Sequence, residues 1–219
     1  MPNEIPEVVI LRLPLYARVL AQLESQGIDV VSSQMLGDLL QATPAQIRKD
    51  LSYFGRFGKQ GRGYNVHYLQ QELRQILGLN RTWIMALVGV GQLGSAILSY
   101  GGFQRQGFQI VAAFDADPAR TGTTVGGLVI QSVAELQETV RTRGIEIGIV
   151  AVPAAHGQEV VDALVACGIK GILNYAPFQV RVPRNVWVRD IDPVVALQSM
   201  TYHLKGVYAP PRAMSVAVE

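Results

Sequence analysis

The 219-residue sequence is poor in the residue types that build metal centres and disulfides. It contains one cysteine, Cys167, and three histidines that are widely separated in the chain. A single cysteine cannot form an internal disulfide, and the ligand spacing of a zinc site is absent, so we expect no metal. Small apolar residues surround Cys167, which predicts a buried and unreactive thiol.

Long apolar runs and a strong net charge are also missing. No run reaches the roughly 20 residues of a membrane span, and the first residues lack a signal-peptide pattern. The formal net charge is only +2, so a nucleic-acid partner must be bound by a local basic patch. With 49% hydrophobic and 16% charged residues, the chain has a typical globular composition and is long enough for two domains. We expect a cytoplasmic protein with no membrane partner.

A glycine motif follows an apolar run in the middle of the chain. Residues 83–88 are all apolar, and the next six residues have the pattern GxGxxG: Gly89, Val90, Gly91, Gln92, Leu93 and Gly94. An apolar strand, a tight glycine turn and a new helix form the site that binds the pyrophosphate of a dinucleotide. The motif alone is weak, because glycine turns are common in α/β proteins.

An acidic residue in the expected position strengthens this interpretation. A second apolar run ends at Asp115, which lies 21 residues after Gly94. A carboxylate there accepts hydrogen bonds from the adenosine ribose and repels a 2′-phosphate, so the pattern predicts NAD(H) rather than NADP(H). We therefore predict a Rossmann domain, a doubly wound parallel sheet, over residues 80–191. The alternative is a Rossmann-like domain whose site is idle or binds another nucleotide.

Two further strands are expected to end at the same edge of this sheet. Apolar runs over 145–152 and 169–174 predict parallel strands that are joined by a helix over 156–167. Ligands of doubly wound sheets bind at the carboxyl edge, which adds these residues to the cofactor site: Val152, Pro153, Asn174, Tyr175, Ala176 and Pro177. Four other segments are predicted: a loop over 118–129, a helix over 132–141, a last strand over 187–191 and a poorly ordered tail over 207–219.

The N-terminal part, residues 1–79, has the pattern of a winged helix-turn-helix. Helical spacing of apolar residues predicts a helix over 7–26 that Pro14 kinks or divides, then two short helices separated by a three-residue turn. The second short helix begins at Thr43 with the signature of a capping box. The glycine-rich segment 55–66 predicts a two-stranded wing, a fourth helix is expected over 69–77, and 78–81 is the natural linker. The predicted fold class is thus α/β, a winged helix followed by a Rossmann domain.

Basic residues are concentrated in this helix-turn-helix and wing. Between residues 43 and 64 the chain has five basic residues and one acidic residue, which gives a local charge of +4. The rest of the chain then has a charge of about −2. The patch favours contacts with DNA phosphates, although a solvated basic face on an interaction domain would show it too. We expect Gln46 and Arg48 nearest the base edges. The full predicted DNA-binding set is Ser33, Gln46, Arg48, Lys49, Ser52, Tyr53, Arg56, Lys59 and Arg62.

Catalytic residues are scarce beside the expected nucleotide site. A dehydrogenase needs a general acid or base near the nicotinamide, and the only candidate is His156. A position in the first turn of a helix explains that histidine equally well. The sequence therefore predicts a sensor rather than an enzyme. Two alternatives stay open: an NAD-dependent dehydrogenase with an accessory helical domain, and an interaction module that binds another nucleotide such as coenzyme A.

Three motifs resemble those of a known family. The segments RKDLSYFG from Arg48, GVGQLG from Gly89 and KGILNYAP from Lys170 are similar to the redox-sensing transcriptional repressor family Rex. The resemblance covers roughly residues 7–205 and implies a winged helix, a Rossmann domain that binds NADH and NAD⁺, and a homodimer that exchanges the helix over 192–206. It also implies repression of respiratory and fermentative genes that ends when NADH rises. A two-fold dimer requires an inverted-repeat operator.

The family's switch residues correspond to three positions in this chain. The aspartate at the start of the family's terminal helix matches Asp192, and its partners match Tyr100 and Arg18. The resemblance implies that this trio, partly across the dimer, helps the protein respond to the bound cofactor form. Pro193 and Ala196 stand where many members have Leu and Glu. Proline suits a first helical position, so a helix is still expected there.

Overall fold

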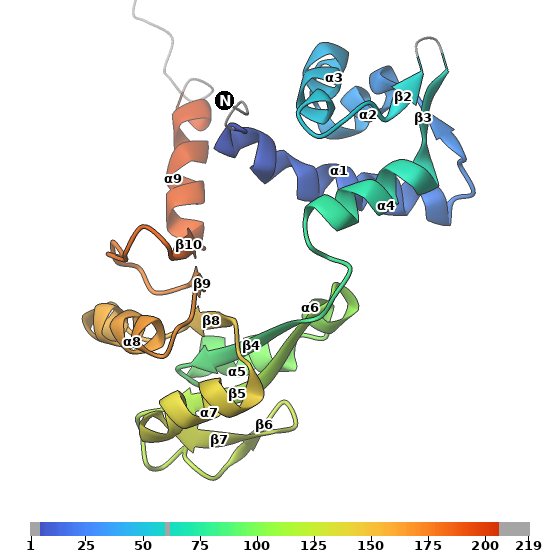
Figure 1. Cartoon of the computed structure of the whole chain (residues 1–219). Helices are drawn as coiled ribbons and strands as arrows, with labels where there is room; N and C mark the ends of the chain where they lie inside the picture. Colours follow the sequence, from blue (N-terminus) through green and yellow to red (C-terminus); the bar gives the residue numbers. More distant parts are fainter. Residues whose placement is uncertain (1–4, 60–61, 206–219) are drawn as a thin grey trace, which may run out of the picture. The chain divides into compact units, whose positions relative to one another are not determined.

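The computed structural model of the protein describes residues 5–59 and 62–205 (Figure 1). It divides into two compact units, with the division between Thr82 and Trp83, close to the predicted boundary after residue 79. The tail predicted for 207–219 lies outside the described residues, as do residues 1–4. Each unit has its own hydrophobic core.

The first unit is the predicted winged helix. Its helices are α1 (Glu7–Ser25), α2 (Ser33–Leu40), α3 (Pro44–Ser52) and α4 (Val66–Ile76), and its strands β1 (Val30–Val31), β2 (Gly58–Lys59) and β3 (Gly63–Asn65) are paired in the order β1-β3-β2. Despite Pro14, α1 is a single helix. The wing strands β2 and β3 are antiparallel, as predicted, and β1 adds a third strand to them.

Side-chain caps explain where α2 and α3 begin. The Ser32 hydroxyl accepts a hydrogen bond from the Met35 N–H, and the Thr43 hydroxyl accepts one from the Gln46 N–H, with Pro44 at the first helical position. Each cap satisfies an N–H that has no partner inside its helix. Only this half of the predicted Thr43–Gln46 capping box is seen, and the Gln46 side chain lies near Arg12 instead.

A buried carboxylate joins the first helix to the third. Asp50 of α3 is 2% exposed and accepts hydrogen bonds from Arg12 Nε and Nη2 at 2.6 and 2.7 Å and from the Tyr16 hydroxyl at 2.5 Å. Both partners come from α1. Burial and the Asp50 contact raise the pKa of Tyr16, and the hydrogen bond to Asp50 raises the pKa of Arg12. The orientation of α3 on α1 therefore depends on a satisfied ion pair inside the domain.

Replacement of Asp50 by asparagine should destabilise the N-terminal domain. Asp50→Asn removes the negative charge opposite Arg12. The Arg12 side chain is 24% exposed, so the cost is expected to be somewhat below that of breaking a fully buried pair. We expect the free energy of unfolding to fall by about 2–3 kcal/mol. Urea unfolding followed by circular dichroism measures the loss. Asp38→Asn, at an exposed position of α2, is the matched control. Equal stability of the two variants would contradict the role assigned to Asp50.

The second unit is a doubly wound sheet with a Rossmann strand order. Its strands are β4 (Trp83–Val88), β5 (Phe108–Asp115), β6 (Thr124–Val125), β7 (Leu128–Ser132), β8 (Ile147–Val150), β9 (Gly171–Asn174) and β10 (Trp187–Asp190). Their spatial order is β10-β9-β8-β4-β5-β7-β6, and only the β6–β7 pair is antiparallel. Numbered along the chain, the six parallel strands lie in the order 3-2-1-4-5-6, which is that of dinucleotide-binding domains.

Helices cover both faces of this sheet. They are α5 (Gln92–Ser99), α6 (Gly102–Arg105), α7 (Leu136–Arg143) and α8 (Ala154–Ala166), with a 3-10 turn, η1 (Val133–Glu135), before α7. The last helix, α9 (Pro193–Leu204), has no buried residue and belongs to neither core. Alternate residues of β4 belong to different cores: Leu87 packs in the same cluster as Ile97 of α5, and Val88 in the same cluster as Leu164 of α8. A central parallel strand is expected to be apolar on both faces for this reason.

The segment over 118–129 differs from the prediction. It was expected to be a loop, but it contains β6 and leads into β7 through a turn at Gly126 and Gly127, both with positive φ. Only one residue of β7, Ile130, is buried, so the apolar alternation that marks a strand is weak in the sequence. A helix follows, as predicted for 132–141, but Ser132 is its cap, its first turn is 3-10 and the α-helix runs from Leu136 to Arg143.

Candidate nucleotide site and candidate DNA interface

The glycine motif forms the tight turn between β4 and α5. Gly89 has a φ of +95°, a conformation that side-chain-bearing residues rarely adopt. A Cβ on Gly94 would lie 1.9 Å from the Gly89 carbonyl oxygen, so only glycine allows α5 to start this close to the turn. Around Gly91 a Cβ would meet nothing within 4 Å, which leaves open space at the N-terminus of α5. An anion placed there would face the N–H groups and positive dipole end of the helix.

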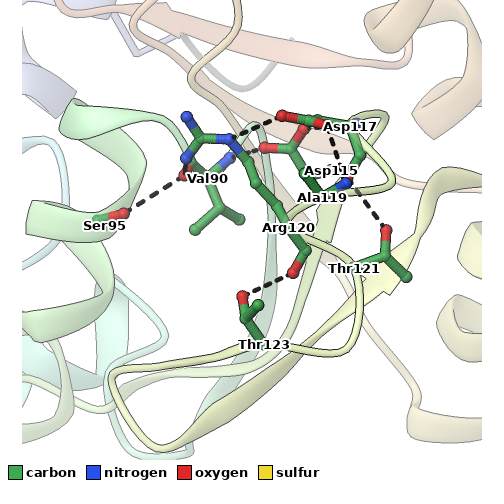
Figure 2. A network of polar contacts seen from close by, with 8 residues as sticks. All are labelled: Val90, Ser95, Asp115, Asp117, Ala119, Arg120, Thr121 and Thr123. Carbon is green, nitrogen blue, oxygen red and sulfur yellow. Dashed lines mark hydrogen bonds and ion pairs between the residues drawn. The ribbon is translucent and has the colours of Figure 1, made fainter.

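Asp115 connects this turn to the next strand. Its Oδ2 accepts a hydrogen bond from the Val90 N–H at 2.7 Å, and its Oδ1 accepts one from the Asp117 N–H at 2.9 Å (Figure 2). A carboxylate has about four acceptor sites, so two remain for a bound ribose. The predicted pairing of the glycine turn with Asp115 is thus present in the fold.

Arg120 is a cation at this site that the sequence analysis missed. Its Nη1 donates a hydrogen bond to the Val90 carbonyl oxygen at 2.5 Å, and its Nε lies 3.5 Å from Asp117 Oδ2 (Figure 2). Arg120 comes from the segment 118–129, for which the sequence predicts a loop. The signal available in the sequence was a basic residue five positions after the strand-ending Asp115.

These groups line a pocket of about 460 Å³ at the carboxyl edge of the sheet. Of the predicted cofactor residues, those that line the pocket are Gly89, Gly91, Asp115, Val152 and Pro153. Asp117 and Arg120 also line it. The pocket lies at the boundary between β4 and β8, where the strand order reverses, which is where doubly wound sheets bind their ligands.

His156, the only catalytic candidate, lines the same pocket. It is the third residue of α8, and its N–H donates to the Pro153 carbonyl oxygen at 3.0 Å. This first-turn position is the structural explanation that the sequence offers for His156 beside a catalytic role.

Asn174, the last residue of β9, forms the hydrogen bonds that hold the predicted residues at the end of this strand. This side chain is 1% exposed; it donates to the Ala176 carbonyl and to Asp190 Oδ1, and accepts from the Ala176 N–H. These internal bonds shape the turn that Tyr175 and Pro177 belong to, and burial raises the pKa of Tyr175. Asn174 thus has a structural explanation, and contact of this turn with a cofactor stays a prediction.

The three predicted switch residues occupy different elements. Arg18 is exposed on α1 in the first unit. Tyr100, at the end of α5, is 62% exposed and packs edge-on against Phe103. Asp192 caps α9, because its Oδ1 accepts the Val194 N–H at 2.8 Å, with Pro193 at the first helical position as expected.

Four of the predicted DNA-binding residues line a hollow of the winged helix. This hollow, of about 720 Å³, lies between α2, α3 and the wing, and these predicted residues line it: Ser33, Arg48, Ser52 and Arg56. Arg48 Nη1 donates to the Ser33 hydroxyl at 2.8 Å, which holds the guanidinium over the gap between α2 and α3. Lys49 and Arg62 are exposed, whereas the side chain of Lys59 lies outside the described part of the chain.

Two of the polar residues predicted on α3 also have partners within the protein. With its amide oxygen toward Arg12, Gln46 accepts hydrogen bonds from Nε and Nη1 at 3.2 Å. The Ser52 hydroxyl donates to the Lys49 carbonyl at 2.7 Å. Tyr53 is half-buried at the end of the helix. A base contact by Gln46 would therefore compete with its contact to Arg12.

Residues 5–59 and 62–205 contain neither a candidate metal centre nor a candidate membrane span. No group of three or more histidine, cysteine or acidic side chains could hold a metal ion there. None of the described helices combines the length and the hydropathy that a membrane crossing requires.

The fold and the two sites together define a class: a transcriptional regulator that has a winged-helix DNA-binding domain and a nucleotide-binding Rossmann domain. Family models agree with this division. A model described as "Putative DNA-binding protein N-terminus" matches residues 4–52, and one described as "CoA binding domain" matches residues 80–178.

Curated relatives identify the family. A "Redox-sensing transcriptional repressor Rex" of Roseiflexus sp. (strain RS-1) is 55% identical over 92% of both chains. The protein of the same name from Syntrophobacter fumaroxidans is 45% identical over 92% of this chain and 96% of its own. The chain belongs to the Rex family of redox-sensing transcriptional repressors.

Solved structures support the same assignment. A crystal structure of RSP in complex with β-NAD⁺ and operator DNA has 35% sequence identity and a TM-score of 0.89, with 94% of both chains covered. A structure of RSP with β-NADH has 33% identity and a TM-score of 0.84 over 94% of this chain and 96% of that one. RSP is described as a Rex-family repressor.

Loss of Arg48 should weaken binding to an A·T-rich inverted-repeat duplex. A lost bidentate base contact costs about 1–3 kcal/mol, and Ser33→Ala, which leaves Arg48 in place but unsupported, should cost less. Fluorescence anisotropy at one salt concentration measures both. Arg141→Ala, at an exposed arginine of the Rossmann domain, is the control. An unchanged affinity in Arg48→Ala would exclude this arginine from the interface.

Proposed function

We propose that this protein is a DNA-binding transcriptional repressor that senses the NADH/NAD⁺ ratio. It occupies its operator when NADH is low and leaves it when NADH binds. The observation that carries the proposal is the likeness, over 94% of the chain, to a repressor solved with NAD⁺ and operator DNA and also with NADH. The alternative of an NAD-dependent dehydrogenase has no comparable support, since the curated relatives carry the name of a repressor.

NADH and NAD⁺ are the cofactors, and the pocket at the carboxyl edge is their site. The pyrophosphate lies at the turn of Gly89–Gly94, and the adenosine ribose donates its hydroxyls to the remaining acceptor sites of Asp115. The description of the Rossmann family model names coenzyme A, but the solved relatives that resemble the whole chain are complexes with NAD⁺ and NADH. His156 has no catalytic role in this proposal, and the protein acts in the cytoplasm, where both operator and cofactor are found.

DNA binds across α3 and the wing. α3 enters the major groove with Arg48 directed to base edges, while Lys49 and Tyr53 contact the backbone or adjacent bases. Arg56 and Arg62 follow phosphates beside the groove, and one of them enters a narrow A·T-rich minor groove. The internal bond of Arg48 to Ser33 supports the proposal, because it orders the guanidinium before DNA arrives.

The active form is a homodimer on an inverted repeat. The support is α9, which has no buried residue although it is rich in apolar side chains. Four of them are each more than half exposed: Val194, Val195, Leu197 and Met200. An apolar helix that residues 5–59 and 62–205 leave uncovered is typical of an oligomer interface. We propose that residues 192–206 dimerise by exchange between two copies. Two-fold symmetry then places the recognition helices about 34–36 Å apart, or a multiple of that.

Redox discrimination takes place at the nicotinamide ring. The phosphates and riboses of NADH and NAD⁺ are identical, so their contacts set affinity without distinguishing the two forms. The ring of NAD⁺ is cationic and that of NADH is neutral, so an apolar cleft favours NADH. A change from 1:99 to 99:1 between DNA-binding and released states needs about 5.5 kcal/mol of differential binding, shared by two sites. Operator DNA must then weaken NADH binding by the same factor.

The first test is the response of operator binding to each cofactor form. Anisotropy of a labelled A·T-rich inverted-repeat duplex should fall to the free-DNA value with NADH and stay high with NAD⁺, because only NADH stabilises the released state. A duplex with a single half-site should bind more weakly than the repeat. Binding that ignores both cofactors would overturn the sensor, and equal NADH affinity with and without operator would overturn the coupling.

Asp192→Asn tests the switch trio. Asparagine caps a helix as well as aspartate does, so α9 should be retained while the charge that faces Arg18 and Tyr100 in the proposed dimer is removed. We expect near-normal operator binding without cofactor and a shift of about fivefold or more in the NADH concentration that releases DNA, the lower range of allosteric coupling. A normal NADH response would exclude Asp192 from the switch. Circular dichroism checks that the helix is present.

A further inference from the structure

We propose that Asp117 and Arg120 form a second element of cofactor selection beside Asp115. In this arrangement Asp117 holds the Arg120 guanidinium on the glycine turn, so that the cation is withheld from the 2′-phosphate of NADP(H). The inference rests on the proposed function, in which the adenosine ribose binds at Asp115.

The geometry places all three charged groups at one edge of the pocket. Asp115, Asp117 and Arg120 line the same 460 Å³ pocket. Figure 2 shows Asp115 and Arg120 directed to Val90, and Asp117 directed to the Arg120 guanidinium. Arg120 Nη1 donates to the Val90 carbonyl oxygen, while Arg120 Nε faces Asp117 Oδ2 at 3.5 Å. Two nitrogens of the guanidinium, Nη1 and Nε, are thus directed to groups of the protein.

The chemistry of the dinucleotide makes this orientation consequential. NADP(H) differs from NAD(H) by a phosphate on the adenosine ribose, which brings about −1.5 to −2 units of charge. Rossmann domains that accept NADP(H) bind this phosphate through a nearby arginine. Here an arginine is present, but its Nη1 and Nε are directed to the Val90 carbonyl oxygen and to Asp117. A 2′-phosphate that seeks these two donors must compete with both contacts.

Removal of the Asp117 charge alone leaves the loop fold in place. Asp117 Oδ1 accepts the Ala119 N–H at 2.9 Å, and asparagine keeps that acceptor. The Thr123 hydroxyl donates to the Arg120 carbonyl, which no side-chain change at residue 117 removes. Asp117→Asn therefore weakens the hold on the guanidinium without dismantling the turn.

A double-mutant cycle tests the proposal through the ratio of NADPH to NADH affinity. The two dissociation constants are measured by fluorescence of the bound reduced nicotinamide for wild type, Asp117→Asn, Arg120→Gln and the double variant. The Arg120 and Asp117 side chains are 44% and 50% exposed, so their pair is a weak one. We expect Asp117→Asn to shift the ratio about fivefold toward NADPH, the upper range for such a pair. In the Arg120→Gln background the shift should vanish.

Glu138→Gln is the matched control, because Glu138 and Arg141 form an exposed i,i+3 ion pair in the same domain, as Asp117 and Arg120 do. It should leave the ratio unchanged. The proposal is overturned if Asp117→Asn does not move the ratio, or if the shift persists without Arg120, since charge repulsion alone would then explain it. Wild type that binds no NADH would instead refute the proposed function itself.

Discussion

The hydrogen bond from the Val90 N–H to the Asp115 carboxylate is the contact on which the nucleotide edge depends. It joins the turn after β4 to the end of β5, and both belong to neighbouring parallel strands of one sheet. The ladder fixes the register, since Val88 lies opposite Phe114 and the Gly89 N–H donates to the Phe114 carbonyl. In the proposed complex, the sheet thereby sets the distance between the ribose at Asp115 and the pyrophosphate at Gly91.

A second carboxylate, Asp50, joins two elements of the winged helix, α1 and α3, by hydrogen bonds. It lies on the same helix as Arg48 and Lys49 but points into the core, where Arg12 and Tyr16 of α1 satisfy it. The exposed face of α3 that carries Arg48 and Lys49 therefore has no contribution from the Asp50 carboxylate at its surface. Arg18, a residue of the proposed switch, lies on the same helix, α1, as Arg12 and Tyr16.

Much of the fold was predictable because local patterns determine it. The cap at Thr43, the glycine turn and the apolar runs of β4, β5, β8 and β9 each depend on residues close together in the chain. The exception is the β6–β7 hairpin, whose strands are short and have a single buried residue, so hydrophobic periodicity does not reveal them. The place of β7 in the sheet results from pairing with β5, and β6 pairs with β7.

The sequence by itself determined the two domain types, the glycine turn with Asp115 and the basic helix-turn-helix, since spacing and residue type are enough to specify them. Only the tertiary structure decided the partners of individual charges. Sequence counting treated Asp50 as part of the basic patch, and the fold buries it against Arg12, 38 residues away. Arg120 is in a loop both in the prediction and in the structure, but its contact with Val90 spans 30 residues. Such contacts depend on long-range packing, which no local pattern encodes.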